Sequence, residues 1–130
     1  MFGKLRFVFT GILLFTLLSS CAGKSTVNVN ESQNGTSVDL QTGDMLVITL
    51  DGNPTTGYQW EMLPNTDGII ELQGDPEYKS GGNLVGSGGK YSFNVKAVKA
   101  GTTRVDLKYY RSFEAGVPPI QTFSIDITVK

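Results

Sequence analysis

The sequence predicts an all-β domain, and three features of its 130 residues lead to that prediction. Apolar and polar residues alternate along several short segments, as they do in a strand with one buried and one solvated face. Sixteen glycines and five prolines divide these segments, and both residue types mark turns. Few segments repeat their apolar residues at the spacing of a helix. Short strands joined by turns therefore explain the pattern better than helices do.

The first expected strand is residues 45–50, an apolar run bounded by Gly-Asp and Asp-Gly pairs and consistent with a buried strand. The segments that follow are an alternating run at 58–62, a brief apolar run at 69–72, and longer alternating runs at 91–97, 105–109 and 123–129. About seven or eight antiparallel strands of this kind predict an immunoglobulin-like β-sandwich. A β-barrel is the rival architecture, because periodicity alone does not separate a sandwich from a barrel.

The N-terminus has the features of an export signal. Lys4 and Arg6 precede an apolar run over residues 7–18, which is too short to span about 30 Å of hydrocarbon. The run leads into Cys21 through Leu-Ser-Ser, and this segment resembles the lipobox of bacterial lipoproteins. The resemblance implies that Cys21 is lipidated on its sulfur and becomes the first mature residue. A general secretory signal that happens to end near a cysteine is the alternative.

These features divide the chain into three parts: a lipoprotein signal peptide at residues 1–20, a lipidated N-terminus and polar tether at 21–36, and a β-sandwich domain at 37–130. Several acyl chains on Cys21 would anchor the protein stably, since each buried CH₂ group contributes about 0.8 kcal/mol. We therefore expect a lipid membrane as one partner. The expected location is the cell envelope, at the outer membrane or cell surface, on the periplasmic or extracellular side.

Most catalytic arrangements are excluded by composition, because the chain contains no histidine and only one cysteine. A Ser-His-Asp or Cys-His arrangement is absent, as is a metal site with imidazole ligands. The carboxylates mostly occur singly, at turns or on solvated strand faces. Without Lys4 and Arg6 the mature chain has 9 basic and 12 acidic residues and a net charge of −3, which argues against nucleic acid as a partner. We expect a protein that is not an enzyme and uses no cofactor or metal.

Three loops have compositions suited to contact with another protein. Their residues are Asn53, Pro54, Thr55, Thr56, Gly57 and Tyr58 in the first loop, Gly86, Ser87, Gly88 and Gly89 in the second, and Arg111, Ser112 and Phe113 in the third. Pro54 fixes its φ angle and Gly57 can adopt a positive φ, so the first loop is expected to be narrow and rigid. Taken alone, each loop is better explained as an ordinary turn between strands.

Taken together, the loops resemble the motifs of the chagasin family, whose members inhibit papain-like cysteine proteases. The first motif, N-P-T-T-G-Y, matches in all six positions and has Trp60 nearby. The second motif, G-x-G-G, matches in full. In the third, Arg111 is present, while Ser112 and Phe113 stand where proline and tryptophan are usual. The resemblance covers residues 38–129.

This resemblance implies a reversible, non-covalent, tight-binding inhibitor that acts as a monomer. Its three loops would lie side by side at one end of the sandwich and block the active-site cleft of a papain-like cysteine protease. Thr56 would lie near the catalytic cysteine, and Arg111 and Phe113 would hold the far side of the cleft, more weakly than the usual motif does. We expect Trp60 to pack in the core and Tyr58 to support the first loop from beneath.

Two other functions compete with inhibition. One is a surface-anchored, immunoglobulin-like adhesion or ligand-binding module without a protease target, for which exposed aromatic side chains would lie on the sheets. The other is a small carbohydrate-binding module that relies on exposed Tyr109, Tyr110 and Phe113. Aromatic side chains exposed on the sheets would favour the adhesion or ligand-binding module, and titration with oligosaccharides would test the carbohydrate-binding module.

Overall fold

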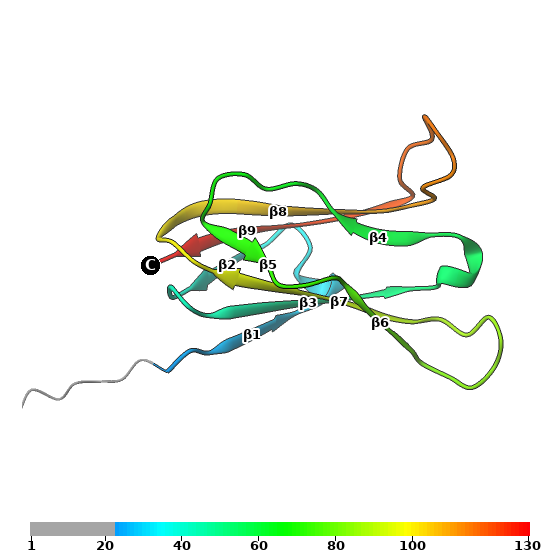
Figure 1. Cartoon of the computed structure of the whole chain (residues 1–130), viewed down its shortest axis with the longest axis horizontal. Coiled ribbons are helices and arrows are strands. Elements are labelled where there is room, and N and C mark those ends of the chain that lie inside the picture. The colour runs from blue at the N-terminus through cyan, green and yellow to red at the C-terminus, as the bar shows by residue number, and fades with distance from the viewer. Residues whose placement is uncertain (1–22) are drawn as a thin grey trace, which may run out of the picture.

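The computed structural model describes residues 23–130 of the chain (Figure 1). The predicted signal peptide, residues 1–20, and the predicted lipidation site, Cys21, lie outside the described residues. Within residues 23–130, no helix has the length and apolar character needed to cross a membrane.

The described residues form two β-sheets that pack face to face. One sheet has the order β1-β3-β7-β5, with β6 also pairing with β7, and the other has the order β2-β9-β8-β4. The strands of the first sheet are β1 (Thr26–Val29), β3 (Met45–Gly52), β5 (Ile70–Leu72), β6 (Glu77–Ser80) and β7 (Gly89–Ala97). Those of the second are β2 (Ser37–Leu40), β4 (Gln59–Met62), β8 (Gly101–Tyr110) and β9 (Gln121–Val129). Two short 3₁₀ helices complete the fold, η1 (Glu31–Gln33) and η2 (Pro54–Thr56).

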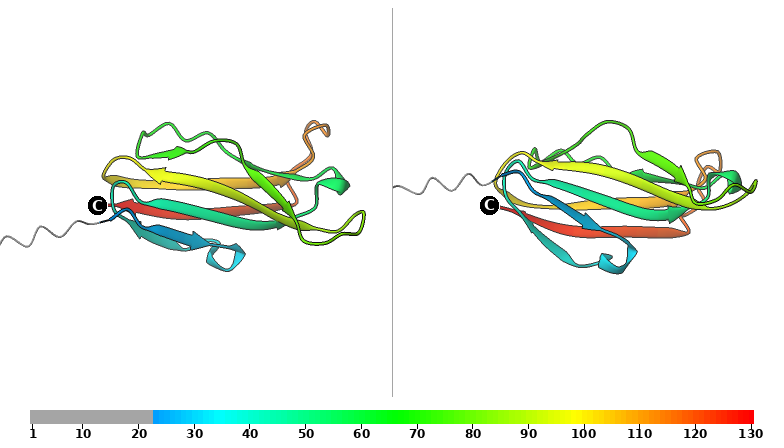
Figure 2. Two further views of the ribbon diagram at one scale, coloured as in Figure 1. Left: turned by 60° about the horizontal axis from the view of Figure 1, so that its bottom comes forward. Right: turned by 90° about the horizontal axis from the view of Figure 1, so that it is seen from below.

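The predicted all-β sandwich is confirmed, and the structure adds two parallel strand pairs to the expected antiparallel ones. β1 runs parallel to β3, and β2 runs parallel to β9. The direction of β1 follows from the path of the chain. After β1 the chain crosses to the second sheet and returns along β2, so β3 starts again at the same end as β1 (Figure 2).

The expected tether at residues 21–36 is corrected by the structure, because the chain joins the sandwich from Ser25 onward. The backbone N–H of Ser25 donates to Asp44 Oδ1 at 3.0 Å, and the next residues form β1 against β3. Val29 is buried in the core. Asn30 then caps η1, accepting a hydrogen bond from the backbone N–H of Ser32 at 2.9 Å. A four-residue edge strand with one buried side chain leaves too short a pattern to be recognised in a polar segment.

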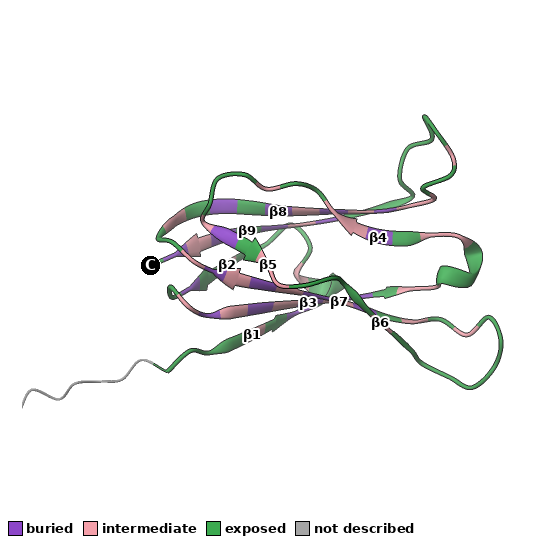
Figure 3. Ribbon diagram, viewed as in Figure 1, coloured by how far each residue is buried: buried purple, intermediate pink, exposed green. Residues whose placement is uncertain are grey.

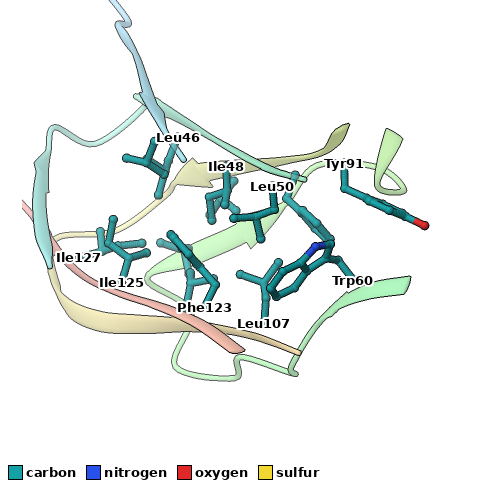
Figure 4. Close-up of a cluster of buried hydrophobic side chains, with 14 of the residues drawn as sticks. Leu46, Ile48, Leu50, Trp60, Tyr91, Leu107, Phe123, Ile125 and Ile127 are labelled. Carbon is teal, nitrogen blue, oxygen red and sulfur yellow. The ribbon is translucent and has the colours of Figure 1, made fainter. Parts of the chain in front are cut away.

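The core lies between the two sheets and contains the apolar members of the alternating segments (Figure 3). Side chains from β3, such as Leu46 and Ile48, face side chains from β9, such as Phe123 and Ile125 (Figure 4). Trp60 is 5% exposed, and its indole N–H donates to the carbonyl of Asp51 at 2.9 Å. The prediction that Trp60 packs in the core is therefore confirmed.

The connections of the sandwich are sorted to its two ends. The β3–β4, β6–β7 and β8–β9 connections, which contain the three predicted loops, lie at one end (Figures 1 and 2). The β2–β3 and β7–β8 connections and the C-terminus lie at the opposite end, where the described chain also enters β1. The sandwich thus gathers three loops that are distant in sequence.

Candidate functional site

The first loop, residues 53–58, is held in shape by its own hydrogen bonds. Asn53 Oδ1 accepts hydrogen bonds from the backbone N–H and the hydroxyl of Thr55, at 3.1 and 2.6 Å. The Thr56 hydroxyl donates to the Asn53 carbonyl at 2.6 Å. Pro54 opens η2 and Gly57 ends it with a φ of 82°, a conformation that favours glycine. These hydrogen bonds, together with Pro54 and Gly57, explain the rigidity expected of this loop.

Aromatic side chains support the first loop from the core. The backbone N–H of Asn53 donates to the Tyr109 hydroxyl at 2.9 Å. The Tyr58 ring lies 5.4 Å from the Tyr109 ring, which in turn stacks on Trp60 at 5.1 Å between centroids. Tyr58 packs against the core while remaining partly exposed. The expectation that Tyr58 supports the loop from beneath is confirmed.

The predicted second loop, 86–89, lies in the connection from β6 to β7 and ends with the first residue of β7. The whole connection, residues 81–88, is called the second loop from here on. Its base is closed by a hydrogen bond from the Gly81 N–H to the Gly88 carbonyl at 2.9 Å. Gly86 has a φ of 84°, and its carbonyl accepts a hydrogen bond from Asn53 Nδ2 at 2.9 Å. This contact ties the second loop to the first across 33 residues of sequence.

The predicted third loop, 111–113, is the first part of the connection from β8 to β9. The whole connection, residues 111–120, is called the third loop from here on, and Arg111 joins it to the first loop. Arg111 Nε donates to the Thr56 carbonyl at 3.1 Å, and its Nη1 donates to Glu114 Oε1 at 2.8 Å. Its guanidinium also lies 4.3 Å from the centre of the Tyr58 ring, within the range of a cation–π interaction. The hydrogen bond to Glu114 raises the pKa of Arg111 above its ordinary value. Arg111, which was expected to grip a partner, is therefore engaged within its own chain.

Phe113 extends the contact between the third and first loops. A Cβ atom placed on Gly57 would lie 2.9 Å from Phe113 Cε1, so the ring rests on the backbone of the glycine. Phe113 is nevertheless 71% exposed. Its neighbour Ser112 is also exposed. The structure thus brings all three predicted loops together and leaves the ring of Phe113 accessible.

Exposed apolar side chains of the described residues gather at the same end of the molecule. Five of the six large hydrophobic residues in this class belong to the second and third loops, and the sixth, Leu63, follows β4. The five are Leu84, Val85, Phe113, Val117 and Ile120.

The sequence analysis did not identify four of these residues as candidates for binding: Leu84, Val85, Val117 and Ile120. Each stands within a glycine-rich or proline-rich segment, where a pattern of alternation gives no expectation of burial. The one feature of the sequence that could have identified them is that they are apolar residues outside the segments with periodic alternation.

The aromatic surface required for a carbohydrate-binding module is not formed. Tyr109 is 7% exposed and lies under the first loop, so it lacks the exposure that a carbohydrate-binding module would require. Tyr110 is partly buried and donates its hydroxyl to Glu61, while Lys108 Nζ lies 4.1 Å from the centre of its ring. Of the three rings, only that of Phe113 is exposed.

Among residues 23–130, no group of three or more His, Cys, Asp or Glu side chains is placed to hold a metal ion. The site consists instead of stiff backbone, hydroxyl groups and exposed apolar side chains. Such a surface is suited to binding another protein.

Comparison with known proteins agrees with this geometry. Residues 39–127 match the family described as "Chagasin family peptidase inhibitor I42". Amoebiasin-1 of Entamoeba histolytica is 29% identical over 109 residues, which cover 80% of this chain and 100% of the relative.

Two solved structures share the architecture. The cysteine protease inhibitor EhICP2 from Entamoeba histolytica superposes with a TM-score of 0.75 at 24% identity, over 83% of this chain and 98% of that one, a likeness of fold. PbICP-C, solved in complex with falcipain-2, gives a TM-score of 0.54 at 25% identity, over 83% of this chain and 100% of that one. With a family match that spans most of the two sheets and all three loops, the chain belongs to the chagasin family of peptidase inhibitors.

Proposed function

We propose that this protein inhibits papain-like cysteine proteases by placing its first and second loops in the active-site cleft and its third loop beside it. The observation that carries the proposal is that hydrogen bonds join the first loop to the second and to the third, and that the second and third loops present exposed apolar side chains beside it. Membership of the peptidase-inhibitor family supports it. So does the complex of the similar inhibitor PbICP-C with falcipain-2.

The hydrogen bonds within the site suit it to tight binding. Loops that are already ordered lose little conformational entropy when they bind. The links from Asn53 to Gly86 and from Arg111 to Thr56 order the three loops before any partner arrives. An interface of standard size, about 1,600 Å², then supports affinities on the order of nanomolar or tighter.

The proposed contact residues differ in what they offer a protease. Thr55 and Thr56 place hydroxyl groups at the tip of the first loop, suited to a polar catalytic centre. Gly88 offers backbone without a side chain, which permits close approach. Leu84 and Val85 at the tip of the second loop offer apolar surface that a cleft would bury.

An inhibition assay of papain by the full chain, purified in detergent, tests the proposal. We expect inhibition constants on the order of nanomolar or lower. Full protease activity at micromolar inhibitor would show that the proposed function is wrong.

A variant at the loop tip tests the site itself. Thr56→Ala is expected to weaken inhibition by about tenfold, equivalent to about 1.4 kcal/mol. Thr42→Ala is the matched control, because Thr42 is also exposed and donates its hydroxyl to a backbone carbonyl, that of Lys130, at the opposite end of the sandwich. Equal inhibition by both variants would contradict the assignment of the first loop.

The alternative function, an adhesion or ligand-binding module that uses a sheet face, has less support. Of the large exposed apolar residues among residues 23–130, five belong to the loops. A partner bound to a sheet face would leave these side chains in water.

We also propose that Cys21 is lipidated and anchors the inhibitor in the cell envelope. The lipobox-like segment before Cys21 supports this. The described chain enters the sandwich at the end opposite the three loops, so an anchor there leaves the loops free to bind. Cys21→Ser is expected to move the protein from the membrane fraction to the soluble fraction and to remove the acyl mass in mass spectrometry. Retention in the membrane would contradict lipidation at this residue.

A further inference from the structure

The third loop has a second half that the family motif does not include. After Arg111, Ser112 and Phe113 the chain continues as Ala-Gly-Val-Pro-Pro-Ile. Val117 and Ile120 are 54% and 55% exposed, and both prolines between them are also exposed. Residues 117–120, called here the apolar ridge, therefore present four consecutive apolar side chains to solvent.

Solvation of charged side chains does not explain why the apolar ridge is exposed, because the ridge and the residues around it carry almost no charge. Between Ser112 and Gln121 the only charged residue is Glu114, and its carboxylate accepts a hydrogen bond from Arg111 at 2.8 Å. Loops on protein surfaces are usually rich in polar residues. A contiguous exposed apolar segment is instead typical of an interaction surface, and the buried centres of protein interfaces are depleted in charge.

The apolar ridge is also held rigid. Pro118 and Pro119 fix their own φ angles, and the residue before each proline is restricted to extended conformations. The backbone N–H of Ile120 donates to the Tyr109 carbonyl at 3.0 Å and so fastens the end of the ridge to β8. At the start of the loop, Glu114 N–H donates to the Arg111 carbonyl at 3.2 Å. A rigid segment loses little entropy on binding.

The charged groups at the base of the third loop are already engaged within the chain. Arg111 is bound to Thr56, Glu114 and the Tyr58 ring. The largest exposed side chains of the loop are the Phe113 ring and the apolar ridge.

The apolar ridge is continuous with the proposed inhibitory surface. Phe113, in the same loop, rests on Gly57 of the first loop. Figures 1 and 2 show the third loop projecting from the ends of β8 and β9 beside η2. A protease whose cleft receives the first and second loops would therefore bring its adjoining surface against the ridge.

We propose that residues 117–120 bind an uncharged, apolar patch on the body of the protease, outside its catalytic cleft, and thereby determine which papain-like enzymes are inhibited most tightly. This proposal rests on the proposed inhibition and assigns it a second contact. The first two loops block the cleft, and the apolar ridge discriminates among proteases by the surface beside it.

The test compares the full chain with its Val117→Ser/Ile120→Ser double variant against a panel of papain-like enzymes that includes papain. We expect the inhibition constant to rise at least about tenfold for one or more enzymes, mostly through faster dissociation. The rank order of the enzymes should also change. Leu63→Ser is the matched control, because Leu63 is an exposed apolar residue outside the three loops, and it should leave every constant unchanged.

The outcomes distinguish a failure of the proposed role of the apolar ridge from a failure of the proposed protease inhibition, on which that role rests. If the wild type inhibits no enzyme of the panel, the proposed function itself fails. If the wild type inhibits but the double variant matches it against every enzyme, the apolar ridge has no contact role and the proposal alone fails. Thermal unfolding of both variants checks that the sandwich is intact, and Val117→Asp provides a second variant with a stronger expected effect.

Self-association is the competing use of the same surface. Sedimentation of the wild type and the double variant at several concentrations distinguishes it. A concentration-dependent dimer of the wild type that the double variant does not form would overturn the proposal in favour of a second copy of this chain. A wild type that stays monomeric supports the protease as the partner.

Discussion

Gly88 and Gly89 are neighbours in one motif, but the space around their Cα atoms differs, and so does the reason why each is a glycine. A Cβ atom at Gly88 would meet only the Gly52 carbonyl, at an ordinary 3.6 Å. A Cβ atom at Gly89 would lie 2.2 Å from the Lys79 carbonyl and 2.7 Å from the Tyr78 hydroxyl. Gly88 is therefore free to serve binding, whereas Gly89 is required by the pairing of β6 with β7.

This difference yields a prediction for the two single alanine variants. Gly88→Ala should keep the unfolding temperature of the wild type but weaken protease inhibition, because a methyl group would stand between the loop and its partner. Gly89→Ala should destabilise the fold by about 1–3 kcal/mol, as overpacked positions do. Thermal unfolding and papain inhibition, measured on both variants, check the prediction. A stable Gly89→Ala protein, or an unfolded Gly88→Ala protein, would contradict it.

Asp44 is a buried carboxylate far from the loops. It is 5% exposed and accepts hydrogen bonds from the backbone N–H groups of Ser25 at 3.0 Å and Gln41 at 2.8 Å. These hydrogen bonds favour the charged form, and that to Ser25 is the larger cause of a pKa below the ordinary value of 3.8. Asp44 thus fastens the start of the sandwich to the β2–β3 connection.

The lowered pKa of Asp44 predicts how stability depends on pH. Because the folded protein binds this proton less readily than the unfolded chain, the stabilisation is present above about pH 4 and is lost as the pH falls through the folded pKa. Asp44→Asn should therefore be less stable than the wild type at pH 7 and lose less stability on acidification. Urea unfolding at pH 7 and pH 3 measures both effects.

Asp39→Asn is the control for this experiment, since Asp39 is exposed and its carboxylate lies 3.6 Å from Lys130 Nζ. It should behave nearly as the wild type at both pH values, because exposed ion pairs contribute little. An equal loss of stability in the two variants at pH 7 would mean that Asp44 has no special role. Inhibition at pH 7 should be unchanged in both.

At the scale of the element, β1 is where the structure departs furthest from the sequence interpretation. Residues 26–29 were expected in a tether, but they pair with β3 over four residues and bury Val29. η1 then contacts the end of β3, where Glu31 accepts a hydrogen bond from the backbone N–H of Asp51. The N-terminal segment therefore covers one edge of the sandwich.

Deletion of this segment should cost measurable stability. Removing residues 1–30 eliminates β1 and is expected to lower the free energy of unfolding by at least about 2 kcal/mol, the approximate value of one buried valine side chain. Removing residues 1–22 keeps every described strand and serves as the control. Denaturant unfolding of the two truncated proteins compares them, and equal stability would restore the interpretation of residues 26–29 as a tether.

The three longest strands could be predicted from the sequence, whereas two of the short edge strands could not. β7, β8 and β9 have nine or ten residues each, with buried and partly exposed side chains in alternation, so their period is visible in the sequence. β2 and β6 have four residues each, with at most one buried. Such edge strands form because β9 and β7 offer a free edge for backbone hydrogen bonds, and this cause lies outside their own sequence.

At the scale of the whole molecule, the sandwich separates binding from attachment. The three loops lie at one end, and the described N-terminal residues and the C-terminus lie at the other (Figure 1). A partner bound at the loops would therefore not meet the end where the proposed lipid anchor leaves the domain.

In the proposed mechanism the inhibitor blocks the cleft by fitting into it and does not react with the catalytic cysteine. This yields a prediction for the complex of inhibitor and protease. No histidine is present in the chain, and none of the loop side chains is an electrophile that the protease thiolate could attack. A protease whose catalytic cysteine is replaced by alanine should therefore bind about as tightly as the active enzyme. Calorimetry of the two complexes measures this, and mass spectrometry should recover the inhibitor uncleaved. A covalent adduct, or binding only to the active enzyme, would contradict the mechanism.

The sequence by itself determined an all-β domain and the positions of its three loops, because alternation and turn residues are local properties of each segment. Alternation alone left a barrel open, and the tertiary structure decided for two packed sheets. Only the tertiary structure decided how the loops combine. The contacts from Asn53 to Gly86 and from Arg111 to Thr56 span 33 and 55 residues, and no local pattern records such pairs. The tertiary structure also bonded Arg111 to the first loop and left Val117 and Ile120 exposed, since such contacts and burial depend on which elements meet in space.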